Sequence, residues 1–240
     1  MMDPRSAVFE KRLKPAARIV AIGGGKGGVG KTTVASLTAL VAARSGLRVG
    51  LLDLDVHGSA AHVVLGIDPR FPDEEGGILP LAGPRGIHFM SAAAFSADRP
   101  LALRGAEVTE AISELLAVTI WPALDVLVVD LPPGLGEGLL DTLKFIPRTE
   151  IVAVTTPSKP ATSVSARFLK AVSPVATVLG LVVNRDRSSG AAQFADTGAP
   201  VLARVPEDEG LEAAIGDPEA MLSSVAAQAV SKLVESLLQE

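Results

Sequence analysis

The segment of residues 25–33 reads GKGGVGKTT, and its residue types are those that bind phosphate. Its glycines let backbone N–H groups approach phosphate oxygens closely, and the N-terminus of a following helix favours negative charge. Lys31 would place a cation at the β- and γ-phosphates, and the Thr32 hydroxyl can ligate Mg²⁺. The spacing satisfies the phosphate-loop pattern G-x-x-x-x-G-K-[ST]. We therefore predict a nucleoside triphosphate site formed by Gly25, Lys26, Gly27, Gly28, Val29, Gly30, Lys31, Thr32 and Thr33.

The elements around this loop must position it. Residues 18–22 are apolar enough for a buried strand, and residues 31–44 have the pattern of a helix that ends at Ser45-Gly46. A chance glycine-rich turn is the alternative interpretation. The strand, loop and helix in this order favour the phosphate loop.

Two aspartates follow predicted strands of the same sheet. Ligands of open α/β sheets lie at the carboxyl ends of the strands. Asp55 comes at the end of the strand 49–54, where a carboxylate can orient the water that attacks the nucleotide; a helix N-cap is the alternative role. Asp130 follows the apolar strand 126–129, as a residue that holds a Mg²⁺-bound water does; a surface turn is the alternative.

Apolar runs alternate with helical patterns along the chain. This order predicts an α/β fold with a doubly wound, mostly parallel sheet and helices on both faces. Residues 1–17 are predicted as an N-terminal arm or short helix, and residues 18–240 as a single domain. The predicted strands are residues 18–22, 49–54, 87–90, 126–129, 151–155, 179–183 and 201–205. The predicted helices are residues 31–44, 106–117, 139–145, 163–172, 191–197 and 221–238.

The composition excludes several classes of function. The chain has no cysteine, so it cannot hold an iron–sulfur cluster or another metal through its own thiolates. A net charge of −5 and only 3% aromatic residues argue against nucleic acid as a partner. The N-terminus lacks the apolar region of a signal peptide, and no apolar stretch reaches the length of a membrane span. We expect a cytoplasmic protein without a membrane anchor.

Lys26 gives the phosphate loop a second lysine, and the run KGGVGKT resembles the deviant Walker A motif of the Mrp, MinD and ParA ATPases. In that superfamily the first lysine reaches the nucleotide of the partner subunit. The resemblance therefore implies ATP and Mg²⁺ as ligands, ATP hydrolysis, and a homodimer that sandwiches ATP. It also implies that Lys26 takes part in catalysis.

Further segments between about residue 18 and residue 215 resemble this superfamily. The sequence DLDVHG at residues 53–58 is similar to its switch I, which implies that Asp55 is catalytic and that Asp53 supports the metal site together with Thr32. The sequence DLPPG at residues 130–134 is similar to switch II of the Mrp family, with Asp130 near Mg²⁺.

Two further positions concern the base of the nucleotide. Asn184 stands where the superfamily has an asparagine that contacts adenine, although an asparagine at a strand end also favours a turn. Pro206, in the sequence VPED that begins at residue 205, is a candidate wall for the adenine ring.

One departure concerns metal chemistry. Mrp-type iron–sulfur carriers have a C-x-x-C after the strand that contains the asparagine, whereas residues 185–190 read RDRSSG here. Residues 53–58, 103–107 and 132–136 are similar to archaeal Mrp-type HypB, which implies nickel insertion into hydrogenase with a HypA-like partner. His57 is then a candidate for the nickel or partner region, though isolated histidines more often have ordinary structural roles.

Two other functions stay open. One is an Mrp-type iron–sulfur assembly ATPase that lacks its own cluster ligands. The other is a positioning ATPase like ParA or MinD, for which the acidic end of the C-terminal helix, unlike the basic helix of MinD, is unfavourable.

Overall fold

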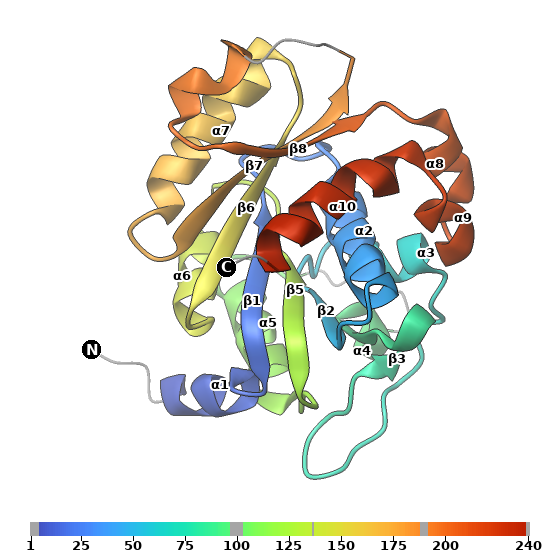
Figure 1. The fold of residues 1–240 in the computed structure, drawn as a ribbon. Coiled ribbons are helices and arrows are strands. Elements are labelled where there is room, and N and C mark those ends of the chain that lie inside the picture. Colours follow the sequence, from blue (N-terminus) through green and yellow to red (C-terminus); the bar gives the residue numbers. More distant parts are fainter. Residues whose placement is uncertain (1–4, 97–102, 136, 188–191, 239–240) are drawn as a thin grey trace.

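A sheet of eight strands, in the order β3-β4-β2-β5-β1-β6-β7-β8, organises the protein (Figure 1). The computed structural model describes residues 5–96, 103–135, 137–187 and 192–238. The strands are β1 (Ala16–Gly23), β2 (Val49–Asp53), β3 (Leu81–Ala82), β4 (His88–Ser91), β5 (Leu124–Asp130), β6 (Thr149–Thr155), β7 (Thr177–Asp186) and β8 (Val201–Pro206). All neighbouring strands are parallel except β3 and β4. The predicted fold class is therefore confirmed.

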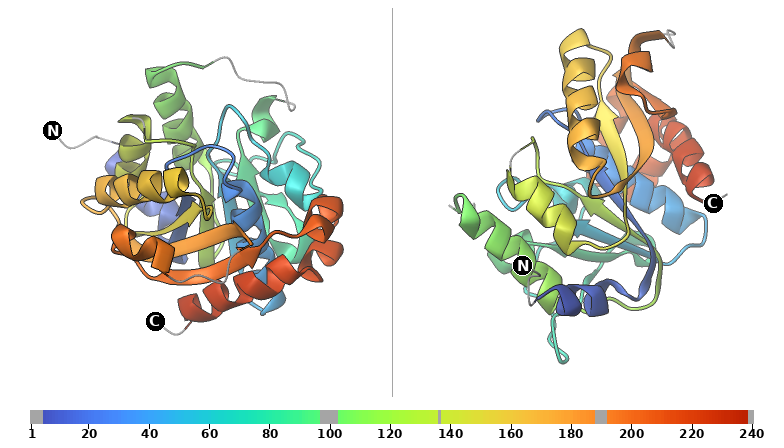
Figure 2. Two further views of the ribbon diagram at one scale, coloured as in Figure 1. Left: turned by 90° about the horizontal axis from the view of Figure 1, so that it is seen from above. Right: turned by 90° about the vertical axis from the view of Figure 1, so that its left-hand side faces the viewer.

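Helices cover both faces of this sheet, as the right-hand view of Figure 2 shows. The helices are α1 (Ser6–Leu13), α2 (Lys31–Arg44), α3 (Ala61–Leu65), α4 (Ala93–Ser96), α5 (Ala106–Val118), α6 (Glu137–Phe145), α7 (Lys159–Val172), α8 (Glu209–Ala214), α9 (Pro218–Leu222) and α10 (Val225–Leu238). Two short 3₁₀ segments, Pro84–Gly86 and Ala192–Thr197, complete the described elements. Because each face carries an apolar helix layer, the inner strands are buried on both sides.

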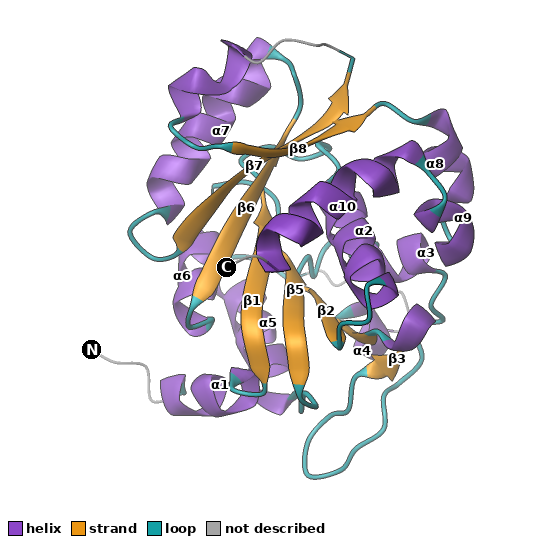
Figure 3. Cartoon of the chain, in the orientation of Figure 1, coloured by secondary structure: helices purple, strands orange, loops and turns teal. Residues whose placement is uncertain are grey.

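The two layers bury separate apolar cores. One core lies between the sheet and α2, α9 and α10, with Leu37, Leu40 and Val230 fully buried. The other lies between the sheet and α1, α5, α6 and α7, with Phe9 and Phe168 buried. Figure 3 shows α10 crossing in front of the strands while α5 and α6 lie behind them.

The predicted N-terminal arm or short helix contains the helix α1. Phe9 of this helix is buried, and its ring lies 5.1 Å from that of Phe145. Nε of Arg12 donates a hydrogen bond of 2.9 Å to the carbonyl oxygen of Ala117 in α5. These contacts attach α1 to the layer that contains α5 and α6. Residues 1–4 lie outside the described residues.

Three expectations for the elements need correction. The predicted helix 221–238 is two helices, because Oγ of Ser224 accepts a hydrogen bond of 3.0 Å from the N–H of Ala227 and so begins α10 anew. The predicted helix 191–197 has 3₁₀ geometry over residues 192–197, and residue 191 lies outside the described residues. The sequence pattern also missed β3, α3, α4 and α8, which are too short for a clear period.

Across the described ranges, no helix is both long and apolar enough to cross a membrane.

Candidate nucleotide-binding site

The phosphate loop connects β1 to α2 at the carboxyl edge of the sheet, where its predicted context required it to be. Gly28 and Gly30 have φ of 76° and 88°, in the left-handed region that residues with a side chain rarely adopt. Gly30 is the N-cap of α2 and provides no side chain to the first N–H groups of the helix. Such N–H groups are free to bind an anion.

The glycines of the loop serve two different purposes. A Cβ added to Gly25 would lie 2.6 Å from Cγ1 of Val164, so this glycine lets the loop pack against α7. A Cβ on Gly27 or Gly28 would meet no atom of the described residues within 4 Å. These two positions therefore border open space, which gives phosphate oxygens room to approach the backbone.

The two lysines of the loop have opposite environments. Lys31, the first residue of α2, is only 7% exposed. Lys26 is exposed on the outer part of the loop. This difference fits the predicted roles, in which Lys31 contacts the nucleotide of its own chain and Lys26 reaches outwards.

Asp130, the last residue of β5, is a buried carboxylate close to the loop. It is 1% exposed, and neither of its oxygens accepts a well-formed hydrogen bond from any residue that the structure describes. Burial raises its pKa to about 7, and the charge of Asp55 raises it further, whereas the Thr32 hydroxyl and the Lys31 ammonium act in the opposite direction. A buried carboxylate without a partner costs free energy unless a cation or proton joins it. The alternative interpretation of Asp130 as a surface turn is therefore wrong.

Asp53 lies opposite Asp130 in the register of β2 and β5. Its Oδ1 accepts a hydrogen bond of 3.0 Å from the N–H of Asp55, and its Oδ2 accepts one of 3.3 Å from the N–H of Ala61. Burial, followed by the charge of Asp130, raises the pKa of Asp53 well above its ordinary value. Both oxygens thus anchor the loop after β2, and this geometry favours Asp130 over Asp53 as a support for Mg²⁺.

Asp55 lies in the loop after β2 and is half-buried. Its Oδ1 accepts a hydrogen bond of 3.1 Å from the N–H of Gly58, which closes a turn. The alternative role as a helix N-cap is wrong, because the N-cap of the following helix is Ala60. The negative charge of Asp55 also contributes to the raised pKa of Asp130, after the larger effect of burial.

Asn184 lies inside β7 and not in a turn after the strand, so the turn interpretation is wrong. Its Nδ2 donates a hydrogen bond of 2.8 Å to the carbonyl oxygen of Val29 in the phosphate loop. The side chain is 7% exposed and occupies the space where a Cβ on Gly30 would lie. No local sequence signal predicts this contact, because it joins residues 155 positions apart.

The remaining predicted positions are farther along the same sheet edge or outside it. Pro206 ends β8 and pairs in register with Asp186, whose carboxylate accepts a bond of 2.6 Å from Arg204. His57 is an exposed turn residue. In the described part of the chain, no group of three or more histidine, aspartate and glutamate side chains is arranged to hold a metal ion. The structure therefore adds no support for nickel at His57.

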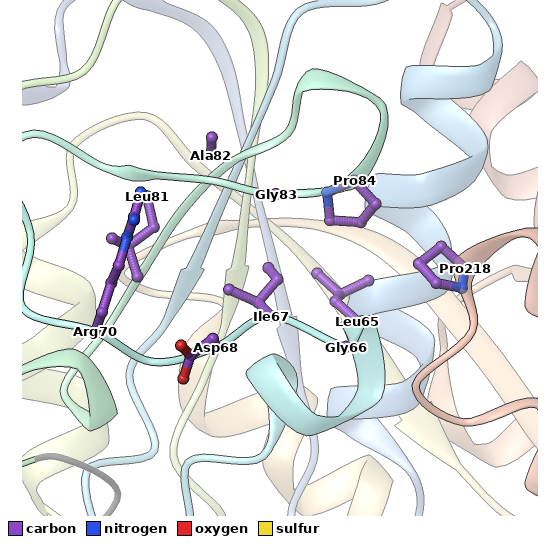
Figure 4. Close-up of a pocket in the computed structure, with 10 residues that line it drawn as sticks. All are labelled: Leu65, Gly66, Ile67, Asp68, Arg70, Leu81, Ala82, Gly83, Pro84 and Pro218. Atoms are coloured by element: carbon purple, nitrogen blue, oxygen red, sulfur yellow. The ribbon is translucent and has the colours of Figure 1, made fainter.

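A cavity of 360 Å³ lies apart from the phosphate loop, between α3, β3 and α9 (Figure 4). Ile67 and Leu65 form one side of it, and Arg70 and Leu81 also belong to its wall. None of the residues assigned to its wall is one of the predicted nucleotide ligands.

A parallel sheet with a phosphate loop after its central strand, and with a buried aspartate at the end of the adjacent strand, defines a P-loop NTPase. Comparison with known families identifies the particular branch. The chain belongs to the ParA family, whose sequence model, described as an NUBPL iron-transfer P-loop NTPase, matches residues 16–239. The predicted Mrp, MinD and ParA superfamily is therefore confirmed.

Similar curated proteins are named iron–sulfur cluster carrier proteins. The one from Methanococcus maripaludis is 34% identical over 189 residues, which are 77% of this chain and 65% of that protein. The one from Deinococcus radiodurans is 34% identical over 256 residues, covering 96% of this chain and 72% of that protein. The one from Pseudomonas fragi is 40% identical over 150 residues, covering 60% and 52%. The chain thus spans about half to three quarters of the length of these relatives.

Solved structures with the same fold include nucleotide complexes. A nucleotide-binding protein of Archaeoglobus fulgidus in complex with ADP, in which cobalt was found, has a TM-score of 0.74 at 24% identity and covers 95% of this chain and 92% of its own. The septum site-determining protein MinD of Pyrococcus horikoshii with Mg-ADP has a TM-score of 0.70 at 23% identity, with 92% and 95% covered. At these identities the likeness establishes the fold.

Proposed function

We propose that this protein binds and hydrolyses ATP with Mg²⁺ and that it acts as a nucleotide-controlled switch. The observation that carries the proposal is the buried carboxylate of Asp130 at the base of the phosphate loop, near Thr32 and Lys31, which has no well-formed hydrogen bond to any of the described residues. This arrangement fits a bound cation, which would relieve the cost of the buried charge. Thr32 and Asp130 would hold Mg²⁺, with Asp130 acting through a water.

Each residue of the loop then has a defined task. The open space at Gly27 and Gly28 admits the phosphates, and Lys31 contributes a buried positive charge. Bound Mg²⁺ would neutralise the charge that develops on the phosphate oxygens. Asp55, fixed by its turn with Gly58, would orient the attacking water. The predicted adenine contacts of Asn184 and Pro206 belong to the same proposal.

The proposed active form is a homodimer across ATP. Lys26 is exposed beside an open face of the phosphate loop, so its ammonium is free to reach a nucleotide held by a second copy. The developing charge of the transition state would then be stabilised from both chains.

Iron–sulfur cluster assembly is the proposed setting of this switch. The support is the description of the matching family model and the names of the relatives, which concern iron transfer and iron–sulfur cluster carriers. The comparisons give no support for nickel insertion or for a HypA-like partner. Because the chain has no cysteine, the cluster would be a cargo whose thiolate ligands come from a partner protein.

The test measures ATP turnover and cluster transfer separately. Phosphate release from purified protein is measured with Mg²⁺ and with EDTA. Transfer from a cluster-loaded scaffold protein to an apo-ferredoxin is followed by visible circular dichroism, with and without ATP. We expect Mg²⁺-dependent hydrolysis and an ATP-dependent change in the transfer rate that Lys31→Ala abolishes. Hydrolysis without any effect on transfer would leave the ATPase and reject the iron–sulfur role.

A further inference from the structure

An apolar cavity of 390 Å³ lies away from the nucleotide site, between α4, α5 and the long loop of residues 66–80. In Figure 1 this loop extends from the lower edge of the molecule, and α5 lies behind the sheet. The cavity wall includes Phe71, Ile78, Phe95, Leu115 and Val118. Its residues come from three separate parts of the chain, so the fold itself assembles this surface.

The aromatic rings at this cavity are unusually exposed for this protein. The chain has seven phenylalanines, no tyrosine and one tryptophan. Phe71 is 62% exposed and Phe95 is 39% exposed, and their rings meet edge to face with centroids 5.6 Å apart. Val118, on the same cavity, is also exposed. A cluster of exposed apolar side chains of this kind marks an interaction site more often than isolated ones do.

Acidic side chains surround this apolar centre. Glu74 and Glu114 belong to the cavity wall, and both are exposed. A second cavity, of 400 Å³, shares Glu114 with the first and adds Glu107 and Glu110 along the outer face of α5. Arg5 pairs with Glu110 at 3.1 Å, and Arg12 donates hydrogen bonds to the carbonyl oxygens of Ala117 and Gly76 beside the cavity. The four glutamates outnumber these two cations, so the surface is acidic.

We propose that this surface, formed by Phe71, Phe95, Val118, Glu74 and Glu114, docks an amphipathic, positively charged segment of a partner protein. Apolar side chains of the segment would fill the cavity between the two phenylalanines, and lysine or arginine side chains would face the glutamates around it. Charge complementarity selects this occupant. A second copy of the chain would bring the same glutamates against each other, which is unfavourable.

A chain of hydrogen bonds joins this surface to the proposed catalytic loop. Oγ of Ser59 donates to the carbonyl oxygen of Asp55 at 2.9 Å and lies 2.9 Å from Oγ of Ser91. Oγ of Ser91 in turn accepts a bond of 3.2 Å from the N–H of Ala93, the first residue of the helix that carries Phe95. A movement of the Asp55 loop would therefore reach Phe95. This coupling rests on the proposed ATPase function, whereas the docking surface does not.

The probe for the surface is a labelled 16-residue helical peptide of leucine and lysine, with a matched peptide of leucine and glutamate. Binding is measured by fluorescence anisotropy without nucleotide. We expect the lysine peptide to bind, the glutamate peptide not to bind, and salt to weaken the complex. The double variant Phe71→Ser/Phe95→Ser and the variant Glu114→Lys should each lower the affinity by about tenfold or more.

Two control variants change similar residues elsewhere. Val225 is 56% exposed on α10, and Glu235 is exposed on the same helix, so Val225→Ser and Glu235→Lys should bind the peptide as wild type does. Equal losses in the control and surface variants would overturn the proposal, as would a lack of effect of the surface variants. Sedimentation of the Phe71→Ser/Phe95→Ser protein completes the test, because loss of a dimer would instead identify a self-interface.

The coupling has its own readout. Peptide affinity should differ between a nonhydrolysable ATP analogue and ADP, and Ser91→Ala should remove that difference while leaving the affinity without nucleotide unchanged. Peptide binding by a protein that does not hydrolyse ATP would reject the proposed function and retain the surface. ATP hydrolysis by a protein that does not bind the peptide would reject the docking surface and retain the proposed function.

Discussion

The side-chain amide of Asn184 donates a hydrogen bond of 2.8 Å to the carbonyl oxygen of Val29, and this bond joins β7 to the phosphate loop. Both groups are buried, so the bond is protected from water. Asn184 also fills the space next to Gly30, where the loop turns into α2. The residue expected to contact adenine thus also holds the conformation of the loop that would bind phosphate.

Asn184→Asp should weaken nucleotide binding. A carboxylate cannot donate a hydrogen bond to the Val29 carbonyl, and a negative charge would stand beside that oxygen in a buried site. We expect about a tenfold loss of affinity for ADP, measured by titration with a fluorescent analogue. Gln228→Glu makes the same amide-to-acid change at an exposed position of α10 and should leave affinity unchanged. Equal affinities for Asn184→Asp and wild type would remove this role of Asn184.

Gly25→Ala and Gly27→Ala should separate packing from phosphate binding. The new methyl group at residue 25 would lie 2.6 Å from Cγ1 of Val164 and 3.0 Å from the Val164 carbonyl oxygen, so the nucleotide-free protein should lose about 1–3 kcal/mol of stability. At residue 27 the methyl group meets no atom of the described part of the chain within 4 Å, so the stability should be unchanged. The same methyl group would occupy the space proposed for the phosphates, so the affinity for ADP should fall. Urea denaturation and ADP titration of both variants measure this, and a reversed order would contradict it.

The local features of the site were predictable from the sequence. The phosphate loop, the strand before it and the helix after it are continuous in the chain, and the pattern at residues 25–33 requires that order. Asp130 could likewise be placed, because an apolar strand that ends in an acid is the arrangement that supports Mg²⁺ in this fold. The buried, parallel strands also have a strong local signal in their apolar runs.

Contacts between distant segments were not predictable in this way. No period or motif shows that Asn184 reaches Val29, or that Asp53 uses both oxygens to anchor the following loop. The break of the C-terminal helix depends on a single serine cap at Ser224, which a helical period passes over. Such details arise when tertiary packing brings the elements together.

The pKa of Asp130 makes the nucleotide-free protein less stable as pH rises. The folded state holds the proton up to a pKa of about 7, whereas the unfolded chain releases it near 3.8. Between these values the folded state binds more protons, so the free energy of unfolding falls as pH increases and levels off above pH 7. The expected loss is on the order of 4 kcal/mol, because the folded-state pKa of about 7 lies far above the unfolded value of 3.8 and already includes the opposing effects of Lys31 and Thr32.

Asp130→Asn should remove this contribution, because the amide stays neutral. Urea denaturation without nucleotide or Mg²⁺ should therefore show the variant to be more stable than wild type at pH 8, and the two should differ less at pH 5. Saturating Mg-ATP should stabilise wild type more than the variant. The opposite order at pH 8 would show that Lys31 fully compensates the carboxylate.

Asp55→Ala should retain ATP and lose hydrolysis. The carboxylate closes a turn with Gly58 and stands near Asp130, whereas binding depends on residues 27–33 of the loop. We expect turnover to fall by about a hundredfold, with nucleotide affinity changed by less than about threefold. Single-turnover phosphate release and equilibrium titration measure the two effects. Normal turnover by Asp55→Ala would show that another residue orients the attacking water.

Lys31→Ala and Lys26→Ala remove one positive charge each from the same loop, but their effects should differ. Lys31 is buried at the start of α2, so its loss should abolish tight ATP binding by the isolated chain. Lys26 is exposed, so its loss should leave that binding intact and impair hydrolysis that depends on a second copy.

Sedimentation with a nonhydrolysable ATP analogue should detect a wild-type dimer, which ADP loosens. Mixing Lys26→Ala chains with Asp55→Ala chains should restore turnover, because each mixed dimer contains one complete site, on the Lys26→Ala chain, with Asp55 from that chain and Lys26 from the other. A monomer at saturating analogue, or no turnover in the mixture, would rule out a lysine that acts across the dimer.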